Sequence, residues 1–330
     1  MSDIFFITRC KCSQLFLILG HFFLFDRQLW CQLFVFLQNV DKWINGMKLN
    51  TPVDFPQSRF GLSYDDRIMV LGSCFASCTG QKLSERGFDV LVNPFGTLYN
   101  PASVASCIER LESGEHFTPE DCVQLGAGST KVGSFHHHTL AAKDSVEEFL
   151  QSANMALDRA REFWDSCNVV IVTLGTSWCY RHRERDRIVA NCLKRNACEF
   201  ERFFLGRERT VELLEAMVSK GRKVVFTVSP IRHLADGAHG NNLSKANLLL
   251  GIDEVVSGHP DVAEYFPAYE IMMDELRDYR FYAEDMIHPS AQAENYIFER
   301  FIAWALSPSE QEKYRLNDKA FRRSRHIPML

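Results

Sequence analysis

Two short stretches of this 330-residue chain carry side chains that enzymes use for nucleophilic catalysis. The first is Gly72-Ser73-Cys74, in which a hydroxyl and a thiol directly follow a glycine. The second is Asp285-Met286-Ile287-His288, in which a carboxylate precedes an imidazole by three residues. Asp285 can accept a hydrogen bond from one nitrogen of His288 and so fix the tautomer of the ring. The other ring nitrogen is then free to take a proton from a nucleophile.

A strand, a tight turn and a helix are predicted around Gly72. The apolar run at residues 68–71 is typical of a strand, and residues 81–85 favour a helix. Gly72 supplies backbone freedom, and the exposed amides of a helix N-terminus stabilise negative charge at Ser73 or Cys74. The alternative is that Ser73 caps the helix and Cys74 is a small buried hydrophobic residue.

From residue 67 onward, short β-rich runs alternate with longer helical ones, which predicts parallel strands joined by crossover helices. Segments 100–143 and 181–206 fit no crossover and are expected to be insertions. The resulting fold class is α/β, a three-layer α/β/α sandwich whose loops at the carboxyl ends of the strands meet in one crevice. Strands are expected at 68–71, 88–92, 168–174, 223–228 and near 280–282, and helices at 145–164, 209–220, 261–279 and 291–305.

Composition argues against several classes of function. The net charge is −5, with acidic and basic residues interspersed, so we expect no nucleic-acid partner. The 11 cysteines are odd in number and irregularly spaced, which favours a reducing cytoplasm over a disulfide framework. The consecutive histidines at 136–138 point in different directions and lack a partnered carboxylate motif, so neither a metal nor a cofactor is expected.

Residues 1–46 differ from the rest of the chain because they are dense in Phe, Leu, Cys and Trp. Their longest apolar run has about a dozen residues, whereas a membrane-spanning helix needs roughly 20, so we expect no membrane span. A more ordinary sequence begins at Met47. We interpret residues 1–46 as an extension translated upstream of a natural start at Met47, and residues 47–330 as a single domain.

Five phrases occur in one order along the chain, and together they resemble the GSCFA domain family of bacteria, which is similar to the SGNH, or GDSL-type, hydrolase superfamily. The resemblance runs from about residue 50 to 305 and implies a flavodoxin-like parallel sheet. The phrases are GSCFA at 72–76, NPFGTLYNP at 93–101, TLGTSW at 173–178, VSPIRHL at 228–234 and DYRFYAEDMIHPS at 278–290.

This resemblance implies roles for individual residues in catalysis. Aligning the Gly-Asp-Ser of the superfamily with Gly72-Ser73-Cys74 places the nucleophilic serine on Cys74, with Ser73 as the second choice. His288 is then the base and Asp285 the group that orients it. A Cys74 thiolate is favoured by a protonated histidine and by a helix N-terminus.

The resemblance also implies an oxyanion hole. The superfamily combines the amide of the nucleophile with a glycine after the second strand and an asparagine after the third. Gly96 and the Gly175 loop occupy these places here. Because the third-strand phrase contains no asparagine, Thr176 or Asn93 is expected to donate instead.

Three further residues are candidates for substrate binding. Arg232 and His233 follow the fourth strand, where they would bind an anionic or polar acyl acceptor; the alternative is a surface arginine beside a capping histidine. His137 lies in a loop that we expect to fold over the crevice and contact substrate.

The superfamily resemblance implies an acyl-ester hydrolase or acyltransferase that acts on an acylated small molecule or glycan. The alternative, from another class, is a non-catalytic protein that binds a carbohydrate or acyl ligand on a hydrolase-like scaffold. The missing third-strand asparagine favours this alternative.

Overall fold

The computed structural model describes residues 51–218 and 220–324. The chain divides into two compact units, Met1–Thr51 and Pro52–Leu330, and all the elements named below belong to the second. The predicted extension at residues 1–46 lies outside the described residues, and the domain boundary at residue 47 stays a prediction. No helix in the described part of the chain has the length and hydropathy needed to cross a membrane.

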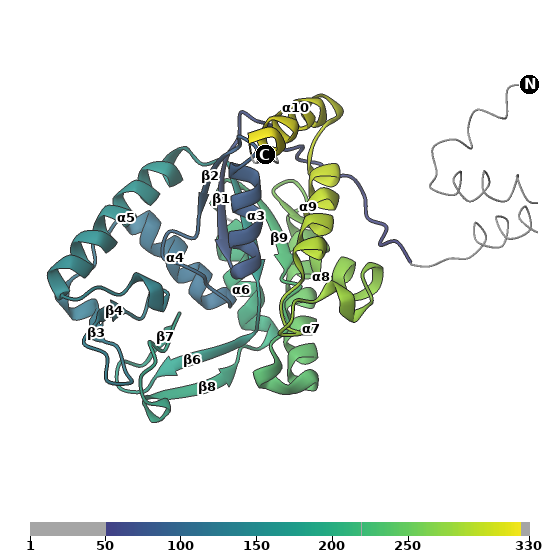
Figure 1. Cartoon of the computed structure of the whole chain (residues 1–330). Helices are drawn as coiled ribbons and strands as arrows, with labels where there is room; N and C mark the ends of the chain where they lie inside the picture. The colour runs from purple at the N-terminus through teal and green to yellow at the C-terminus, as the bar shows by residue number, and fades with distance from the viewer. Residues whose placement is uncertain (1–50, 219, 325–330) are drawn as a thin grey trace, which may run out of the picture. The chain divides into compact units, whose positions relative to one another are not determined.

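A five-stranded sheet forms the centre of this unit (Figure 1). The strand order is β10-β9-β5-β1-β2, and each neighbouring pair runs parallel. Counted along the chain within this sheet, the order is 2-1-3-4-5, as in flavodoxin. The strands are β1 (Arg67–Gly72), β2 (Asp89–Val92), β5 (Val169–Leu174), β9 (Lys223–Val228) and β10 (Ala263–Tyr265).

Alternate residues of β1 face two separate cores. Ile68 and Val70 belong to one hydrophobic cluster, whereas Met69 and Leu71 belong to the other. Because helices cover both faces, the strand at 169–174 is buried along its whole length and is apolar except for Thr173. The first cluster includes residues of α3 (Cys74–Ser84), α8 (Ala268–Glu270) and α9 (Ala291–Ala305), and the second includes residues of α4 (Pro101–Ser113), α5 (Val146–Ser166), α6 (Arg207–Val218) and α7 (Gly237–Gly258). This arrangement confirms the predicted α/β/α sandwich.

Most of the predicted elements are present. The strands expected at 68–71, 88–92, 168–174 and 223–228 correspond to β1, β2, β5 and β9. The helices expected at 145–164, 209–220 and 291–305 correspond to α5, α6 and α9. A further helix, α10 (Pro308–Ser324), follows α9.

The predictions for 261–279 and 280–282 are wrong. Residues 263–265 form the edge strand β10, which pairs with residues 224–226 of β9. After the short helix α8 comes a π-helical turn, η6 (Ile271–Glu275), and the expected strand is a 3₁₀ turn, η7 (Tyr279–Phe281). A three-residue edge strand carries too little periodicity to interrupt the helical pattern around it.

The segment at 100–143 is not wholly an insertion, because α4 packs in the core with Val104, Ile108 and Leu111 buried. The rest of that segment holds the hairpin β3 (Cys122–Gln124) and β4 (Val132–Ser134). The predicted second insertion contributes to a three-stranded antiparallel sheet of order β7-β6-β8. Its strands are β6 (Trp178–His182), β7 (Arg187–Val189) and β8 (Phe200–Phe204), and the remaining 3₁₀ turns are η2 (Pro119–Asp121), η3 (Thr139–Ala141), η4 (Ala197–Glu199) and η5 (Leu234–Asp236).

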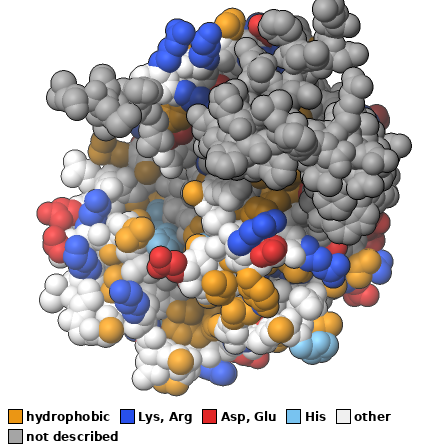
Figure 2. Space-filling model, turned by 45° about the vertical axis from the view of Figure 1, so that its right-hand side comes forward, with side chains coloured by type: hydrophobic (Ala, Val, Ile, Leu, Met, Phe, Trp, Pro, Cys, Tyr) orange, Lys and Arg blue, Asp and Glu red, His pale blue; other side chains and the backbone are white. Residues whose placement is uncertain are grey.

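Charged side chains are mixed on the face drawn in Figure 2. Acidic and basic groups lie among hydrophobic and uncharged ones there, without a continuous patch of one sign. The interspersed charges of the sequence are therefore also interspersed in space on this face.

Gly72 ends β1 at a point where only glycine fits. Its φ is +132°, and a Cβ atom there would lie 2.1 Å from the carbonyl oxygen of Thr173 on the neighbouring strand. We expect Gly72→Ala to lower the free energy of unfolding by about 3 kcal/mol or to prevent folding, because both the backbone strain and the clash involve rigid backbone. Chemical denaturation measures the change. Gly206→Ala is the matched control because a Cβ atom at Gly206 meets nothing within 4 Å; equal effects of the two changes would contradict the prediction.

Candidate active site

A pocket of about 540 Å³ lies at the carboxyl ends of the central strands. Its lining comes from the loops after β1, β2, β5 and β9, from the loop before α9, and from the β6–β8 sheet. The pocket therefore lies where ligands bind in open parallel sheets. Six of the predicted site residues line it: Ser73, Cys74, Thr176, Arg232, His233 and His288. Asp285 does not line the pocket but is hydrogen-bonded to His288.

Gly175 is the point at which four of these loops meet. A Cβ atom at Gly175 would lie 3.1 Å from Nε2 of His233, 3.4 Å from the carbonyl oxygen of Tyr99 and 3.7 Å from Cβ of Ser73. A Cβ atom at this position would be in tight contact with the His233 ring, which would have to shift by a few tenths of an ångström. The glycine of the third-strand phrase therefore allows these loops to pack closely.

The turn after β1 presents Cys74 more openly than Ser73. Ser73 is 1% exposed, and its Oγ has no hydrogen-bond partner among the described residues. The alternative in which Ser73 caps the helix is wrong, because its side chain makes no capping bond to α3. Cys74 is half-buried, and its Sγ lies 3.6 Å from Oη of Tyr99.

Tyr99 is a neighbour of Cys74 that the sequence analysis did not identify. Thr97 donates a hydrogen bond of 3.2 Å to Oη of Tyr99, which leaves the Tyr99 proton free to point at the sulfur. Burial raises the pKa of Tyr99 to about 12, so the phenol remains a donor at neutral pH. The only sequence signal for Tyr99 is its place in the second-strand phrase.

Asp285 and His288 form a hydrogen-bonded pair. Nδ1 of His288 lies 2.6 Å from Oδ2 of Asp285, while Oδ1 of Asp285 accepts from the amides of Ile287 and His288. The hydrogen bonds from the His288 amide, the His288 ring and the Ile287 amide lower the pKa of Asp285 to about 2. The carboxylate therefore stays ionised and holds Nδ1, which leaves Nε2 of His288 as the reactive nitrogen.

The structure does not bring the predicted oxyanion residues together as donors. The amides of Gly175 and Thr176 both donate to the carbonyl of Tyr99, at 2.8 and 3.0 Å. The amide of Gly96 donates to the Asn93 carbonyl, and His138 covers the glycine, since a Cβ there would lie 2.4 Å from Cβ of His138.

Asn93 holds the turn after β1, Gly72-Ser73-Cys74, through both ends of its side-chain amide. Its Oδ1 accepts from the amide of Gly72 at 2.8 Å, and its Nδ2 donates to Oγ of Ser77 at 2.8 Å. Its own backbone adopts a φ of +42°, the left-handed region in which asparagine is more common than most residues. Both ends of this side-chain amide are therefore engaged within the turn.

Asn100 also lines the pocket, although it was not among the hydrogen-bond donors predicted from the sequence. Its Oδ1 caps α4 by accepting from the amide of Ser103 at 2.9 Å. This bond orients the side-chain amide so that the NH₂ group is left for other acceptors. The Asn-Pro pair at 100–101, a helix-start signal, was the available clue.

Arg232 and His233 both line the pocket, as their position after β9 predicts. Burial and the charges of Lys245, His288 and Arg202 lower the pKa of His233 to about 4, so this imidazole is neutral at neutral pH. Its amide donates to Oδ1 of Asn241 rather than capping a helix with its ring.

Lys245 is fully buried below the pocket. Its Nζ donates to the carbonyls of Gly175 and Ser229, each at 2.7 Å, and it forms no ion pair with a described carboxylate. Burial lowers the pKa of Lys245 to about 7. The neighbouring Ser244 accepts from the amide of Ser177, so α7 fixes the loop after β5 through two successive side chains.

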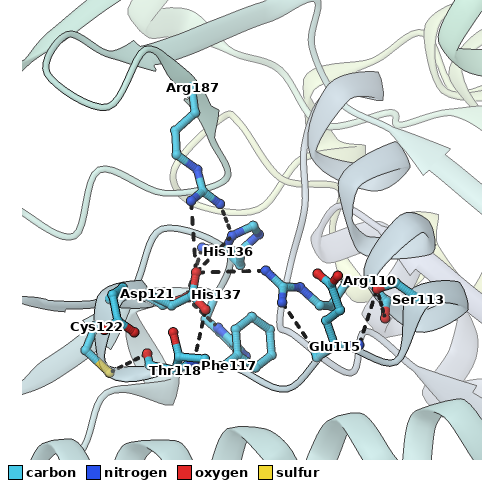
Figure 3. Close-up of polar contacts among 12 residues, drawn as sticks. Arg110, Ser113, Glu115, Phe117, Thr118, Asp121, Cys122, His136, His137 and Arg187 are labelled. Carbon is cyan, nitrogen blue, oxygen red and sulfur yellow. Dashed lines mark hydrogen bonds and ion pairs between the residues drawn. The ribbon is translucent and has the colours of Figure 1, made fainter.

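His137 lies away from the pocket. Its side chain is 3% exposed, its Nδ1 lies 3.0 Å from Oγ of Ser134, and the rings of Phe95, Phe117 and Phe149 surround it. Figure 3 shows it beside His136, which lies with Arg187 and Asp121. Among the described residues, no group of three or more His, Cys, Asp or Glu could hold a metal ion.

Comparison with known proteins gives one match. The model of the GSCFA family matches residues 67–301. This range contains all the residues of the nucleophile turn, the Tyr99–Asn100 loop and the Asp285–His288 loop. No curated protein and no solved structure matches the chain.

The buried histidines predict a dependence of stability on pH. Burial and Arg110 lower the pKa of His137 to about 4, below the unfolded value of 6.5. The unfolded chain therefore binds this proton first, and the free energy of unfolding falls as pH decreases from 6.5 to 4. We expect His137→Gln to reduce the slope in this window by up to about 1.4 kcal/mol per pH unit, the effect of one proton.

Denaturant titrations at several pH values measure this slope. His239→Gln is the control, because His239 is exposed on α7. A slope that is the same in His137→Gln, His239→Gln and the wild type would show that His137 does not contribute.

Proposed function

Because this chain belongs to the GSCFA family, and because Cys74 and the Asp285–His288 pair meet at one pocket, we propose that it is an acyl-ester hydrolase or acyltransferase of the SGNH-like type. The observation that carries the proposal is this shared pocket: Cys74 and His288 both line it, and Asp285 holds the other nitrogen of the imidazole. A nucleophile, a base and an orienting carboxylate are the parts that acyl transfer requires.

In the proposed reaction, Nε2 of His288 takes the thiol proton and the Cys74 sulfur attacks the acyl carbonyl. The tetrahedral intermediate expels the alcohol, which takes the proton from His288, and a thioester remains on Cys74. Water or a second alcohol then attacks the thioester, with His288 again accepting the proton. Water gives hydrolysis and an alcohol gives transfer, so the acceptor alone separates the two activities.

Three sets of hydrogen-bond donors lie near Cys74 in the proposed reaction. The Tyr99 hydroxyl can donate to a thiolate at Sγ, since Thr97 already occupies its acceptor side. The first amides of α3 lie at Cys74 and Phe75, and Ser73 does not cap them. Together with the NH₂ group of Asn100, they are the donors we propose for the oxyanion.

The proposed substrate is an acylated small molecule or glycan. The pocket has room for such a group, and its β6–β8 wall includes Trp178 and Tyr180. All eight cysteines of the described residues are unpaired, which supports our assignment of the protein to a reducing compartment such as the cytoplasm.

A non-catalytic ligand-binding protein is the second candidate, and one observation favours it. The amides of Gly96, Gly175 and Thr176 are all bonded within the protein, so the oxyanion hole implied by the family resemblance is not formed by them. The two functions differ in whether Cys74 reacts and whether an ester is turned over.

The nucleophile is tested by labelling. We expect an alkylating probe to modify Cys74 in the wild type and in Ser73→Ala, because the Ser73 side chain is almost fully buried and should not contribute. Cys74→Ala should lose this labelling. A panel of acyl esters should show turnover that Cys74→Ala and His288→Ala reduce by about 10³-fold or more. Mass spectrometry locates the label and a spectrophotometric assay follows ester cleavage.

His239→Ala is the matched control for His288→Ala, since it removes an exposed histidine far along the chain from the pair. If a serine-directed phosphonate labels the turn and only Ser73→Ala abolishes that labelling, Ser73 is the nucleophile. If neither probe reacts at the turn and no ester is cleaved, the enzyme proposal fails and the binding protein is favoured.

Asn100 is tested by Asn100→Ser, which keeps a capping hydroxyl for α4 but removes the NH₂ donors. We expect kcat for the best ester of the panel to fall by about 10²-fold, with the unfolding midpoint nearly unchanged. Asn196→Ser is the control, because Asn196 is an exposed residue that caps η4 in the same way. Unchanged turnover in Asn100→Ser would remove Asn100 from the oxyanion hole.

A further inference from the structure

Two arginines line the nucleophile pocket, and their surroundings differ. Arg202 forms an ion pair with Asp236, whose side chain is 4% exposed. The Arg202 guanidinium also lies over Trp178, 4.2 Å from the ring centroid. Its charge is therefore neutralised within the wall of the pocket, and it ties β8 to the loop after β9.

Arg232 has no such carboxylate. Its guanidinium donates one hydrogen bond, of 3.3 Å, to the carbonyl of Met286 and lies 5.5 Å from the ring centroid of Tyr282. No ion pair joins it to a carboxylate of the described residues. Because a guanidinium has five N–H donors in a planar fork, most of its donor capacity remains for a ligand.

The fold places this charge close to the base. The amide of Arg232 donates to the carbonyl of Ile287, and its side chain binds the carbonyl of Met286, the two residues that directly precede His288. An anion on Arg232 would therefore lie beside the loop that presents His288. The buried Lys245 does not line this pocket, because its Nζ donates to the carbonyls of Gly175 and Ser229 behind the loops.

A second pocket, of about 280 Å³, shares Arg232 as part of its wall. It is formed by η6 and the chain that follows, and its lining includes Asp274 and Asp278. These carboxylates oppose an anion on that side, although Arg277 also lines it. In the nucleophile pocket, by contrast, Asp236 is the only carboxylate among the described residues that line it, and it is paired with Arg202. An anion bound by Arg232 is thus favoured on the nucleophile side.

We propose that the substrate of this site carries an oxyanion, either a carboxylate or a phosphate, and that Arg232 binds it within the nucleophile pocket. The inference rests on the proposed function, because it places the anion on the molecule whose acyl group Cys74 attacks. It narrows the acylated small molecule or glycan to an anionic one. A guanidinium recognises both kinds of oxyanion through two parallel hydrogen bonds.

Charge selection is measured at Cys74 without any substrate. Iodoacetate and iodoacetamide alkylate a thiol by the same displacement of iodide, but only iodoacetate carries a carboxylate. The ratio of their rates at Cys74, divided by the same ratio for glutathione, reports how strongly the pocket prefers an anion. We expect this normalised ratio to be about tenfold in the wild type and to approach one in Arg232→Gln.

Two further variants separate the effect of the Arg232 charge from that of its loop contacts. Arg232→Lys keeps the charge and should keep most of the preference for iodoacetate. Loss of the loop contacts alone would change the rates of both reagents equally and leave their ratio unchanged. Arg277→Gln is the matched control, because this exposed arginine lines only the second pocket. An equal normalised ratio in wild type and Arg232→Gln, or an effect of Arg277→Gln as large as that of Arg232→Gln, overturns the proposal.

Binding of anions to Cys74→Ala protein separates this proposal from the catalytic one. Inorganic phosphate and succinate are titrated separately by calorimetry in an uncharged buffer, so that the two arms distinguish a phosphate from a carboxylate. We expect at least one of them to bind, and Arg232→Gln in the same background to weaken it by about tenfold or more. This result would support Arg232 as the anion-binding residue of the pocket even if no ester is cleaved. If neither anion binds in an Arg232-dependent way, the proposal fails, whether or not neutral esters are turned over.

Discussion

The buried ammonium of Lys245 fixes the floor of the pocket. A lysine without a carboxylate partner is costly to bury, and its reduced pKa of about 7 reflects that cost. The two carbonyls that accept its hydrogen bonds belong to Gly175 and Ser229, at the carboxyl ends of the neighbouring strands β5 and β9. Because one ammonium binds both carbonyls, it links the starts of the loops that follow β5 and β9. The side chains of Thr176 and His233 can then face the same space.

The nucleophile turn is fixed in the same manner, by a polar side chain placed behind it. Asn93 binds the amide of Gly72 and the hydroxyl of Ser77, so the loop after β2 holds both sides of the turn after β1. Gly72 can adopt its left-handed φ only because no Cβ meets the strand beside it. Asn93 and Gly175, which the sequence predicts as oxyanion donors, thus form hydrogen bonds that fix the backbone of the loops around the pocket.

This explains how far the sequence could predict the site. The types and spacing of Asp285 and His288 suffice to predict their hydrogen bond, because only two residues separate them in a short loop. Apolar runs suffice for β1, β5 and β9, which are buried on both faces. Spacing could not show that the amides of Gly175 and Thr176 donate to the carbonyl of Tyr99, since these hydrogen bonds join residues far apart in the chain. Nor could periodicity separate β10 from the π-helical turn after it.

Arg232 joins the loop after β9 to the loop that carries His288. Met286, in the loop that carries His288, has a φ of +56°, a conformation that costs free energy for a residue other than glycine. Two contacts from Arg232 hold that loop, one from its amide to Ile287 and one from its guanidinium to Met286. Among the described residues, no carboxylate forms an ion pair with this guanidinium. An anion bound to it, as we propose, would share this side chain with the loop that carries His288.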